Sequence, residues 1–258
     1  MITESVTIVE KISTDNNGPV IEIKGLYKSF GQNDILKGVD ITIQKGENLV
    51  VLGKSGSGKS VTIKCLVRLV EADKGSIKVF GTDIETLDNT QLNEIRVRVG
   101  FLFQNAALYD SMSVRENLEF PLKRHTKKLT APAIDAAVRK ALDSVGLEDA
   151  IDKMPSELSG GMRKRIGLAR TLILKPEIIL YDEPTTGLDT ITSREISELI
   201  LAVQKKFKTT SVIITHDMAC AKLTGDRVVI LKDGVIHTEG TYEELEKSDD
   251  EWVRSFFI

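Results

Sequence analysis

The chain has 258 residues, of which 41% are hydrophobic and 28% are charged, and its formal net charge is −3. This length supports one substantial hydrophobic core with room for a second lobe. The near balance of charge argues against a nucleic-acid partner, which a basic surface would attract. Since no apolar run reaches about eighteen residues and the N-terminus lacks a basic start, we expect neither a membrane span nor a secretory signal.

The first third of the chain has the pattern of short strands. Residues 1–18 end in STDNNGP, which predicts a flexible arm before the fold. Apolar and polar residues then alternate, and this alternation predicts strands within 20–30 and 38–53 and a shorter strand with a turn within 75–84. Between them, apolar residues at helical spacing predict a helix over 60–70.

The remainder of the chain mixes helices with buried strands. Residues 108–172 are mostly helical and are expected to form an inserted lobe, with a helix over 130–147 capped by Thr130. Short apolar runs within 176–184 and 210–218 predict strands buried on both faces, and 228–240 predicts a hairpin. Strands interleaved with helices predict one α/β domain over 19–258 with a mainly parallel sheet and a C-terminal tail at 241–258.

One glycine-rich segment interrupts these elements. It follows the apolar strand NLVVL (48–52), opens the predicted helix and fits G-x-x-x-x-G-K-[ST], the pattern of a phosphate-binding loop. Its backbone N–H groups and the helix N-terminus would surround phosphate oxygens. Lys59 would reach the β- and γ-phosphates, and the Ser60 hydroxyl would bind Mg²⁺. The predicted nucleotide contacts are Gly53, Lys54, Ser55, Gly56, Ser57, Gly58, Lys59, Ser60 and Val61.

Two acidic residues end the apolar strand at 178–182. In open α/β sheets, ligands bind beside the carboxyl ends of strands, so Asp182 and Glu183 are expected near the phosphate-binding loop. Asp182 would bind Mg²⁺ through water, and Glu183 would orient and polarise the attacking water. The two cysteines, Cys65 and Cys220, have no Cys or His at metal spacing and are expected to be reduced, buried thiols.

The segment ELSGGMRKRIGLARTLILKPEIILYDEPTTGLD (157–189) resembles the ATP-binding cassette (ABC) transporter ATPases, and the resemblance extends over about 20–245. It implies a P-loop, RecA-like core with a mainly parallel sheet, an N-terminal antiparallel β subdomain and a helical subdomain at about 108–172. Ser159, Gly160 and Gly161 match the family's signature turn, which is a second anion site at a helix N-terminus. In the family, two copies pair head to tail, so that each signature turn meets the other copy's nucleotide.

The resemblance assigns further residues one by one. Phe30 matches the aromatic residue that stacks on adenine, with Tyr27 as a competitor and core packing as the structural alternative. Gln104 matches the glutamine that contacts Mg²⁺ and the attacking water. Asp189 matches the aspartate at the dimer interface, and His216 matches the histidine at the γ-phosphate. The predicted catalytic residues are thus Glu183, His216 and Gln104, and the predicted Mg²⁺ ligands are Ser60, Gln104 and Asp182.

The signature turn departs from the family pattern at Met162, where most members have glutamine. Methionine lacks the amide hydrogen bonds of glutamine, so the contact to the ribose is in doubt. The sequences of 103–122, 154–171 and 182–192 resemble those of the ATPase subunits of Mla/Mce-type lipid transporters. These subunits commonly have methionine at the position of Met162. This narrower resemblance implies ATP, Mg²⁺, a homodimer and a place at the cytoplasmic face of the inner membrane. It also implies permease subunits docked near 104–122 and a lipid-binding Mce-type protein in the complex.

Several interpretations remain open from the sequence. The chain could energise another importer, for example for amino acids, serve in a soluble assembly or repair cassette, or bind nucleotide without hydrolysis. The permease groove could be lined by Leu108, Tyr109, Met112, Val114, Leu118 and Phe120, or these residues could pack in the core of the helical lobe. The apolar C-terminal tail, with Trp252, Val253, Phe256, Phe257 and Ile258, is expected to pack on its own fold or on a partner subunit.

Overall fold

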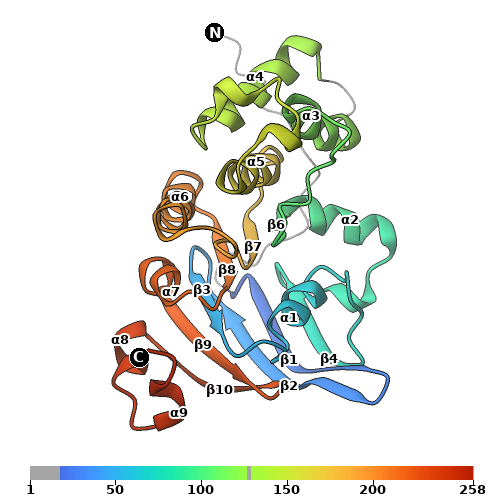
Figure 1. Ribbon diagram of the computed structural model, residues 1–258. Helices are drawn as coiled ribbons and strands as arrows, with labels where there is room; N and C mark the ends of the chain where they lie inside the picture. Colours follow the sequence, from blue (N-terminus) through green and yellow to red (C-terminus); the bar gives the residue numbers. More distant parts are fainter. Residues whose placement is uncertain (1–17, 127–128, 258) are drawn as a thin grey trace.

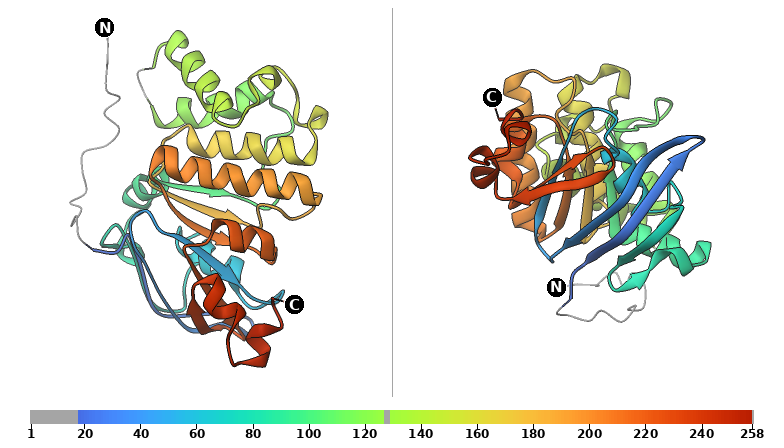
Figure 2. Two further views of the ribbon diagram at one scale, coloured as in Figure 1. Left: turned by 90° about the vertical axis from the view of Figure 1, so that its left-hand side faces the viewer. Right: turned by 90° about the horizontal axis from the view of Figure 1, so that it is seen from below.

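A computed structural model of the protein describes residues 18–126 and 129–257 (Figure 1). The predicted arm at 1–18 lies outside these residues except for its last position. The described chain forms a small antiparallel sheet, a larger mainly parallel sheet with flanking helices, and a helical lobe beyond them (Figure 2). The predicted α/β class with an N-terminal antiparallel part is confirmed.

The small sheet contains the early strands and has the order β2-β1-β4-β5. Its strands are β1 (Ile21–Phe30), β2 (Asn33–Ile43), β4 (Lys74–Val79) and β5 (Thr82–Asp83), and every pairing between them is antiparallel. The alternating sequence pattern explains this sheet, because its apolar residues, such as Ile21 and Ile23, lie on the buried face. The register of β1 shifts between Ile23 and Leu26, around Gly25, which has a left-handed backbone.

The larger sheet has the order β10-β9-β3-β8-β7-β6. It contains β3 (Asn48–Leu52), β6 (Val99–Leu102), β7 (Ile178–Asp182), β8 (Thr210–Ile214), β9 (Arg227–Lys232) and β10 (Val235–Gly240). All pairings are parallel except that of β9 with β10, which is the predicted hairpin. Because β3, β7 and β8 are parallel neighbours, the residues that follow them meet at one edge of the sheet. We call this the carboxyl edge, and the opposite one the amino edge.

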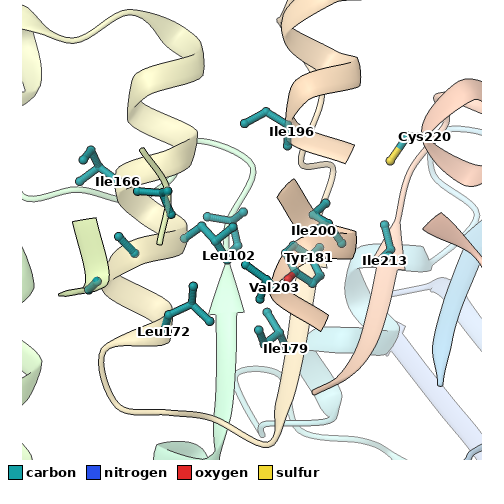
Figure 3. Close-up of a cluster of buried hydrophobic side chains, with 14 of the residues drawn as sticks. Leu102, Ile166, Leu172, Ile179, Tyr181, Ile196, Ile200, Val203, Ile213 and Cys220 are labelled. Atoms are coloured by element: carbon teal, nitrogen blue, oxygen red, sulfur yellow. The ribbon is translucent and has the colours of Figure 1, made fainter. Parts of the chain in front are cut away.

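Successive residues of the central strands enter two different cores. Leu49 and Val51 of β3 face the core shared with the small sheet and α1 (Lys59–Cys65), whereas Val50 and Leu52 face the core under the longer helices. Figure 3 shows the latter core, where Tyr181 and Ile213 from the sheet meet Ile200 and other residues of α6 (Thr190–Phe207). Burial on both faces explains why these strands are continuous apolar runs.

The helical lobe contains α3 (Val114–His125), α4 (Ala131–Asp143) and the short helices η2 (Glu148–Ala150) and η3 (Pro155–Glu157). Helix α5 (Gly160–Leu172) contacts α3 and α4 on one side and β6 and α6 on the other (Figure 2). Three further helices flank the sheets: η1 (Ile84–Thr86), α2 (Asn89–Arg98) and α7 (Met218–Thr224). No helix among 18–126 and 129–257 has the length and apolar character needed to span a membrane.

Two predictions about helices were wrong in part. The helix predicted over 60–70 ends at Cys65, because the chain turns into a left-handed conformation at Arg68 and the N–H groups of Leu69 and Val70 both bond to the carbonyl of Lys64. Thr130 does precede α4, but its hydroxyl makes no cap hydrogen bond. Both cysteines are free and buried, as predicted, and burial raises the pKa of each thiol to about 11.

The C-terminal tail packs on its own chain, as the sequence predicted. It forms α8 (Tyr242–Glu246) and α9 (Glu251–Arg254), and Val253 is fully buried in the core cluster that lies under the longer helices. Trp252 packs under the ammonium group of Lys232, which lies 4.1 Å from the centre of its ring. Asp250 bonds to His237 at 2.7 Å, and this pair fixes the tail against β10. Ile258 lies outside the described residues.

Candidate functional site

The phosphate-binding loop connects β3 to α1 in a conformation that requires glycine. Gly53 and Gly58 have φ values of 156° and 105°, and a Cβ on Gly53 would lie 2.5 Å from the carbonyl oxygen of Leu231. The Lys59 ammonium group donates to the carbonyl oxygens of Gly53 and Lys54 at 2.8 and 3.0 Å. The loop therefore curls around its own lysine, and the Ser57 hydroxyl, which is buried, has no hydrogen-bond partner within the described chain. This is a cradle with polar groups left for a ligand.

A cavity of about 700 Å³ lies over this loop at the carboxyl edge. That volume is typical of small-molecule sites. Of the predicted residues, the cavity wall contains Phe30, Gly53, Lys54, Ser55, Gly56, Gly58, Lys59, Ser60, Val61, Gln104, Glu183 and His216. Ile35, Thr186 and Phe256 also line it, and none of these three was predicted. Phe30 is half-exposed at its mouth, whereas the competitor Tyr27 does not line the cavity.

A hydroxyl–carboxylate pair lies beneath the cradle. Ser60 Oγ donates to Asp182 Oδ1 at 2.7 Å, and Asp182 is almost fully buried. Mg²⁺ in nucleotide sites takes one or two protein oxygens and completes its shell with water and phosphate oxygens. Among the described residues no group of three or more His, Cys, Asp or Glu residues could hold a metal by itself. The Ser60–Asp182 pair thus fits the donor set that Mg²⁺ needs beside a bound nucleotide.

Glu183 is held in a fixed position by its neighbours. Its φ is 52°, a left-handed conformation that is uncommon for glutamate. Its N–H donates to Ile214 of β8 at 2.9 Å, and its carbonyl accepts from the Lys164 ammonium group at 3.0 Å. The carboxylate oxygen Oε2 lies 2.7 Å from His216 Nδ1 and accepts from the Thr186 hydroxyl at 3.0 Å. The side chain therefore points at the cavity and has little freedom to move.

Lys164 is the main residue of this region that the sequence interpretation missed. It comes from α5, is buried, and burial lowers its pKa to about 8 against the opposing charges of Glu183 and Asp182. Burial also lowers the pKa of Lys59, with the same two carboxylates opposing. The sequence offered a weak signal for Lys164, because it lies on the helix that begins at Ser159 and is surrounded there by other basic residues.

The segment after β6 carries Gln104 to the cavity. Gln104 is exposed, and two left-handed residues, Ala106 and Ala107, follow it. Arg170 of α5 donates to the carbonyl oxygens of both alanines, at 3.0 and 2.8 Å, and so fixes this turn. Burial lowers the pKa of the Arg170 guanidinium. The position of Gln104 therefore depends on α5.

The residues that the sequence assigned either to a permease groove or to the core of the lobe divide between the core and the surface. Val114 and Leu118 are fully buried and belong to the core of the lobe, because they lie on the inner face of α3. Tyr109 and Phe120 remain exposed, with ring centres 5.1 Å apart. Asn117, which is buried and was not predicted, organises the turn before α3: it accepts from the N–H of Tyr109 and donates to three backbone carbonyls.

The signature turn lies apart from the cavity. Ser159 caps α5 by accepting from the N–H of Met162, and neither Ser159, Gly160 nor Gly161 lines the cavity over Lys59. Instead this turn packs against the start of α6, where a Cβ on Gly161 would lie 2.5 Å from Thr192 Cγ2. Asp189 is exposed there and caps α6 by accepting from the N–H groups of Ile191 and Thr192. The two turns that the sequence predicted to bind anions therefore lie at separate places in one chain.

A glycine cradle at a helix N-terminus, with two carboxylates at the carboxyl edge of a parallel sheet, defines a nucleotide-binding protein of the P-loop class. Residues 36–186, more than half of the chain, match the family model described as "ABC transporter". The chain therefore belongs to the ABC transporter family and is an ATP-binding, ATP-hydrolysing subunit of such a transporter.

Three relatives and one solved structure illustrate the similarity. The chain is 44% identical over 239 residues to the "Probable ribonucleotide transport ATP-binding protein mkl" of Mycobacterium leprae, covering 93% of this chain and 69% of that protein. It is 40% identical to "Protein TRIGALACTOSYLDIACYLGLYCEROL 3, chloroplastic" of Arabidopsis thaliana (92% and 73% covered) and 38% identical to the "Methionine import ATP-binding protein MetN" of Clostridium acetobutylicum (88% and 70% covered). The dimeric ATP-binding cassette MJ0796, in a post-hydrolysis state bound to ADP and Pi, superposes with a TM-score of 0.79 at 30% identity, covering 86% of this chain and 98% of that one.

Proposed function

We propose that two copies of the chain pair head to tail and close on two ATP molecules, and that the opening and closing of the dimer drives a membrane permease. The observation that carries this proposal is the separation of the two anion-binding turns, since the Ser159 turn does not reach the cavity of its own chain. A second copy, rotated by a two-fold axis, would bring Ser159, Gly160, Gly161 and Asp189 to that cavity. The similar cassette MJ0796, whose structure is described as dimeric and bound to ADP and Pi, supports the pairing of two copies.

Within one half-site, each residue has a proposed task. The cradle from Gly53 to Val61 would hold the phosphates, and Lys59, already desolvated, would contact the β- and γ-phosphates. Ser60, Asp182 and Gln104 would hold Mg²⁺, which would neutralise charge on the phosphates when bound. Phe30 would stack on adenine at the mouth of the cavity.

The Glu183 carboxylate would orient the attacking water and accept its proton. Its fixed backbone, its contact with Thr186 and its 2.7 Å contact with His216 Nδ1 leave Oε1 as the oxygen that faces the water. His216 would position Glu183 and contact the γ-phosphate. Lys164 would hold the Glu183 carbonyl and so keep the left-handed turn in place. These tasks follow from geometry that exists before nucleotide binds, which favours preorganisation.

The conformational change that accompanies ATP hydrolysis would be transmitted to the permease through the turn after Gln104. Tyr109 and Phe120 form an exposed aromatic pair beside this turn, which suits a short amphipathic helix of a permease. We place the chain at the cytoplasmic face of the membrane through this contact. The cargo we propose is a phospholipid, moved by an Mla/Mce-type complex that includes a lipid-binding Mce-type protein. The proposal of a phospholipid cargo rests on the sequence around Met162 and on the Arabidopsis relative, whose name is that of a glycolipid.

Import of an amino acid is the second candidate, favoured by the relatives named for methionine import. Affinity purification of the complex from its native membrane, with mass spectrometry of subunits and bound small molecules, separates the two. A complex with an Mce-type subunit and bound phospholipid supports lipid transport. A complex with a soluble amino-acid-binding subunit and no Mce-type subunit contradicts it.

The ATPase mechanism is tested by Glu183→Gln, which keeps the shape of the side chain and removes its basicity. We expect turnover to fall by about 100-fold or more while ATP affinity changes by less than about threefold. The variant with ATP should elute as a stable dimer in size-exclusion chromatography with light scattering. The control is Glu198→Gln, an exposed residue of α6 that pairs with Arg194. Parental turnover would contradict the role of Glu183, and lost turnover with a monomer throughout would contradict the head-to-tail dimer.

A further inference from the structure

A second cavity, of about 430 Å³, lies at the amino edge of the parallel sheet, away from the nucleotide site. Its wall includes Pro176, two residues before β7, and Thr210, the first residue of β8. Three parts of the fold meet there: the small sheet contributes Phe80, the helical lobe contributes Lys140, and α6 contributes Phe207. Its volume lies within the range of small-molecule sites.

Five lysines surround this cavity. They come from the turn before β3, from α4, from the end of α5 and from the end of α6: Lys45, Lys140, Lys175, Lys206 and Lys208. Within the described residues, no carboxylate oxygen lies within 4.0 Å of any of the five ammonium groups. Glu177, which also lies in the wall, is engaged by Arg98 at 2.7 Å. The chain as a whole is slightly acidic, so this concentration of positive charge is local.

Helix dipoles explain only part of this cluster. A cation near the C-terminus of a helix is favourable, which accounts for one lysine at each of the three helices. It does not account for Lys45, which lies between two strands, or for Lys208 in addition to Lys206. Lys175 and Lys208 also have left-handed backbones, with φ values of 55° and 53°, as the chain turns back at the cavity. Like charges at short range repel each other, and an anion among them would remove this cost.

The floor of the cavity is apolar. Phe80, Pro176 and Phe207 form it together with Leu172, and Phe80 is covered on one face by the Arg98 guanidinium, whose central carbon lies 3.7 Å from the ring centre. An apolar floor with a cationic rim is complementary to a molecule that has a hydrocarbon body and an anionic head. We propose that this cavity binds an amphiphile with a single phosphate head group and a short hydrocarbon chain.

The test uses calorimetric titration of the full chain with MgADP in excess, so that the phosphate-binding loop is already filled. The probes are n-octyl phosphate, inorganic phosphate and n-octyl glucoside, which separate the amphiphile from its head and from its chain. Because several CH₂ groups would leave water, we expect octyl phosphate to bind at least about tenfold more tightly than inorganic phosphate. Because several lysines face the head, it should also bind about tenfold more tightly than the uncharged glucoside.

The variant Lys175→Gln/Lys208→Gln assigns the binding to this cavity. Both side chains are exposed, so the fold should be kept, and thermal unfolding checks this. We expect the double variant to bind octyl phosphate about tenfold more weakly. Lys205→Gln is the matched control, since Lys205 is an exposed neighbour on α6 that does not line the cavity, and its affinity should be unchanged.

Four results would overturn the proposal. Inorganic phosphate binding as tightly as octyl phosphate would mean a simple anion site, and equal binding of octyl glucoside would mean an apolar site without charge selection. Parental affinity in the folded double variant would place the amphiphile elsewhere. An acidic protein that binds the lysines while octyl phosphate does not would show a protein-docking surface instead.

Discussion

Lysines at the two edges of the parallel sheet differ in their burial and in their acidic partners. At the carboxyl edge, Lys59 and Lys164 are buried, their pKa values are lowered by burial, and Asp182 and Glu183 lie beside them. At the amino edge, the five lysines of the second cavity are without acidic partners among the described residues. A buried charge is stable only when the fold supplies a charged or polar partner, whereas exposed lysines are solvated by water and need no partner until a ligand binds. Preorganisation at the first edge suits catalysis, and unmatched charge at the second suits reversible binding.

Two helices connect these edges. Helix α5 begins at the Ser159 turn and ends at Leu172, in the wall of the second cavity, and α6 begins at Asp189 and ends beside Lys208. They run side by side along the sheet (Figure 2). The N-terminus of each helix, where the helix dipole is positive, therefore lies at the carboxyl edge, and the C-terminus, where the dipole is negative, lies at the amino edge. The contrast between the edges follows in part from this common direction, and it can be tested one edge at a time.

The largest expected difference between the edges comes from removing one lysine at each. Lys59→Met removes the group in the cradle, and we expect ATP affinity to fall by about 100-fold, since a desolvated ion pair with phosphate is lost. Lys208→Met should leave ATP affinity within about threefold of the parent. Fluorescent ATP titration measures both. Equal losses in the two variants would mean that the edges are not electrostatically separate.

The second test concerns the contact of α5 with α6 at the carboxyl edge. Gly161→Ala would place a methyl group 2.5 Å from Thr192 Cγ2, so we expect a loss of about 1–3 kcal/mol in the free energy of unfolding. Urea denaturation measures it. The double variant Gly161→Ala/Thr192→Ser removes that methyl group of Thr192, keeps the hydroxyl that donates to Asp189, and should recover most of the loss. No recovery would mean that the contact does not set the helix spacing.

Sequence patterns predicted the fold well where burial is periodic. The small sheet, the strand before Lys59 and the hairpin at 228–240 all follow from alternation and turn residues. The short strand β6 has no such pattern, and it forms a strand because tertiary packing pairs it with β7. Likewise, the strand that carries Asp182 and Glu183 was predicted, but the lysine that holds the Glu183 carbonyl comes from a helix nineteen positions earlier. Contacts of that kind depend on packing, which no local pattern records.

The second cavity could not be predicted from the sequence for the same reason. Its lysines lie at widely separated positions in the sequence, and each by itself is an ordinary surface residue. Phe256 gave no local signal for the nucleotide cavity either, although its apolar neighbours predicted that the tail packs on its own fold. The sequence patterns predicted the motifs around the nucleotide, whose spacing along the chain is fixed by chemistry. They did not predict groups that meet only after folding.

A smaller effect is expected from the titration of Lys164. Its pKa in the folded chain is about 8, below its ordinary value of 10.5, so above pH 8 the unfolded chain holds a proton that the folded chain has released. Stability from this group therefore rises with pH, by about 1 kcal/mol between about pH 8 and pH 9. Lys164→Met should remove this rise when urea denaturation is followed without nucleotide in EDTA. Lys59 contributes in the same direction in both proteins and cancels in the difference. An unchanged pH slope would mean that Lys164 titrates normally.

The smallest expected effect comes from the amino edge in the absence of any ligand. If the exposed lysines repel each other, then Lys175→Gln/Lys208→Gln should stabilise the fold at low ionic strength, by about 0.5 kcal/mol or less, as for other surface pairs. At about 1 M salt the Debye length falls to about 3 Å, and the gain should vanish. Lys205→Gln, outside the cavity, should show less of either effect. A gain that persists in salt would have a cause other than repulsion, and it would contradict an electrostatic contrast between the two edges.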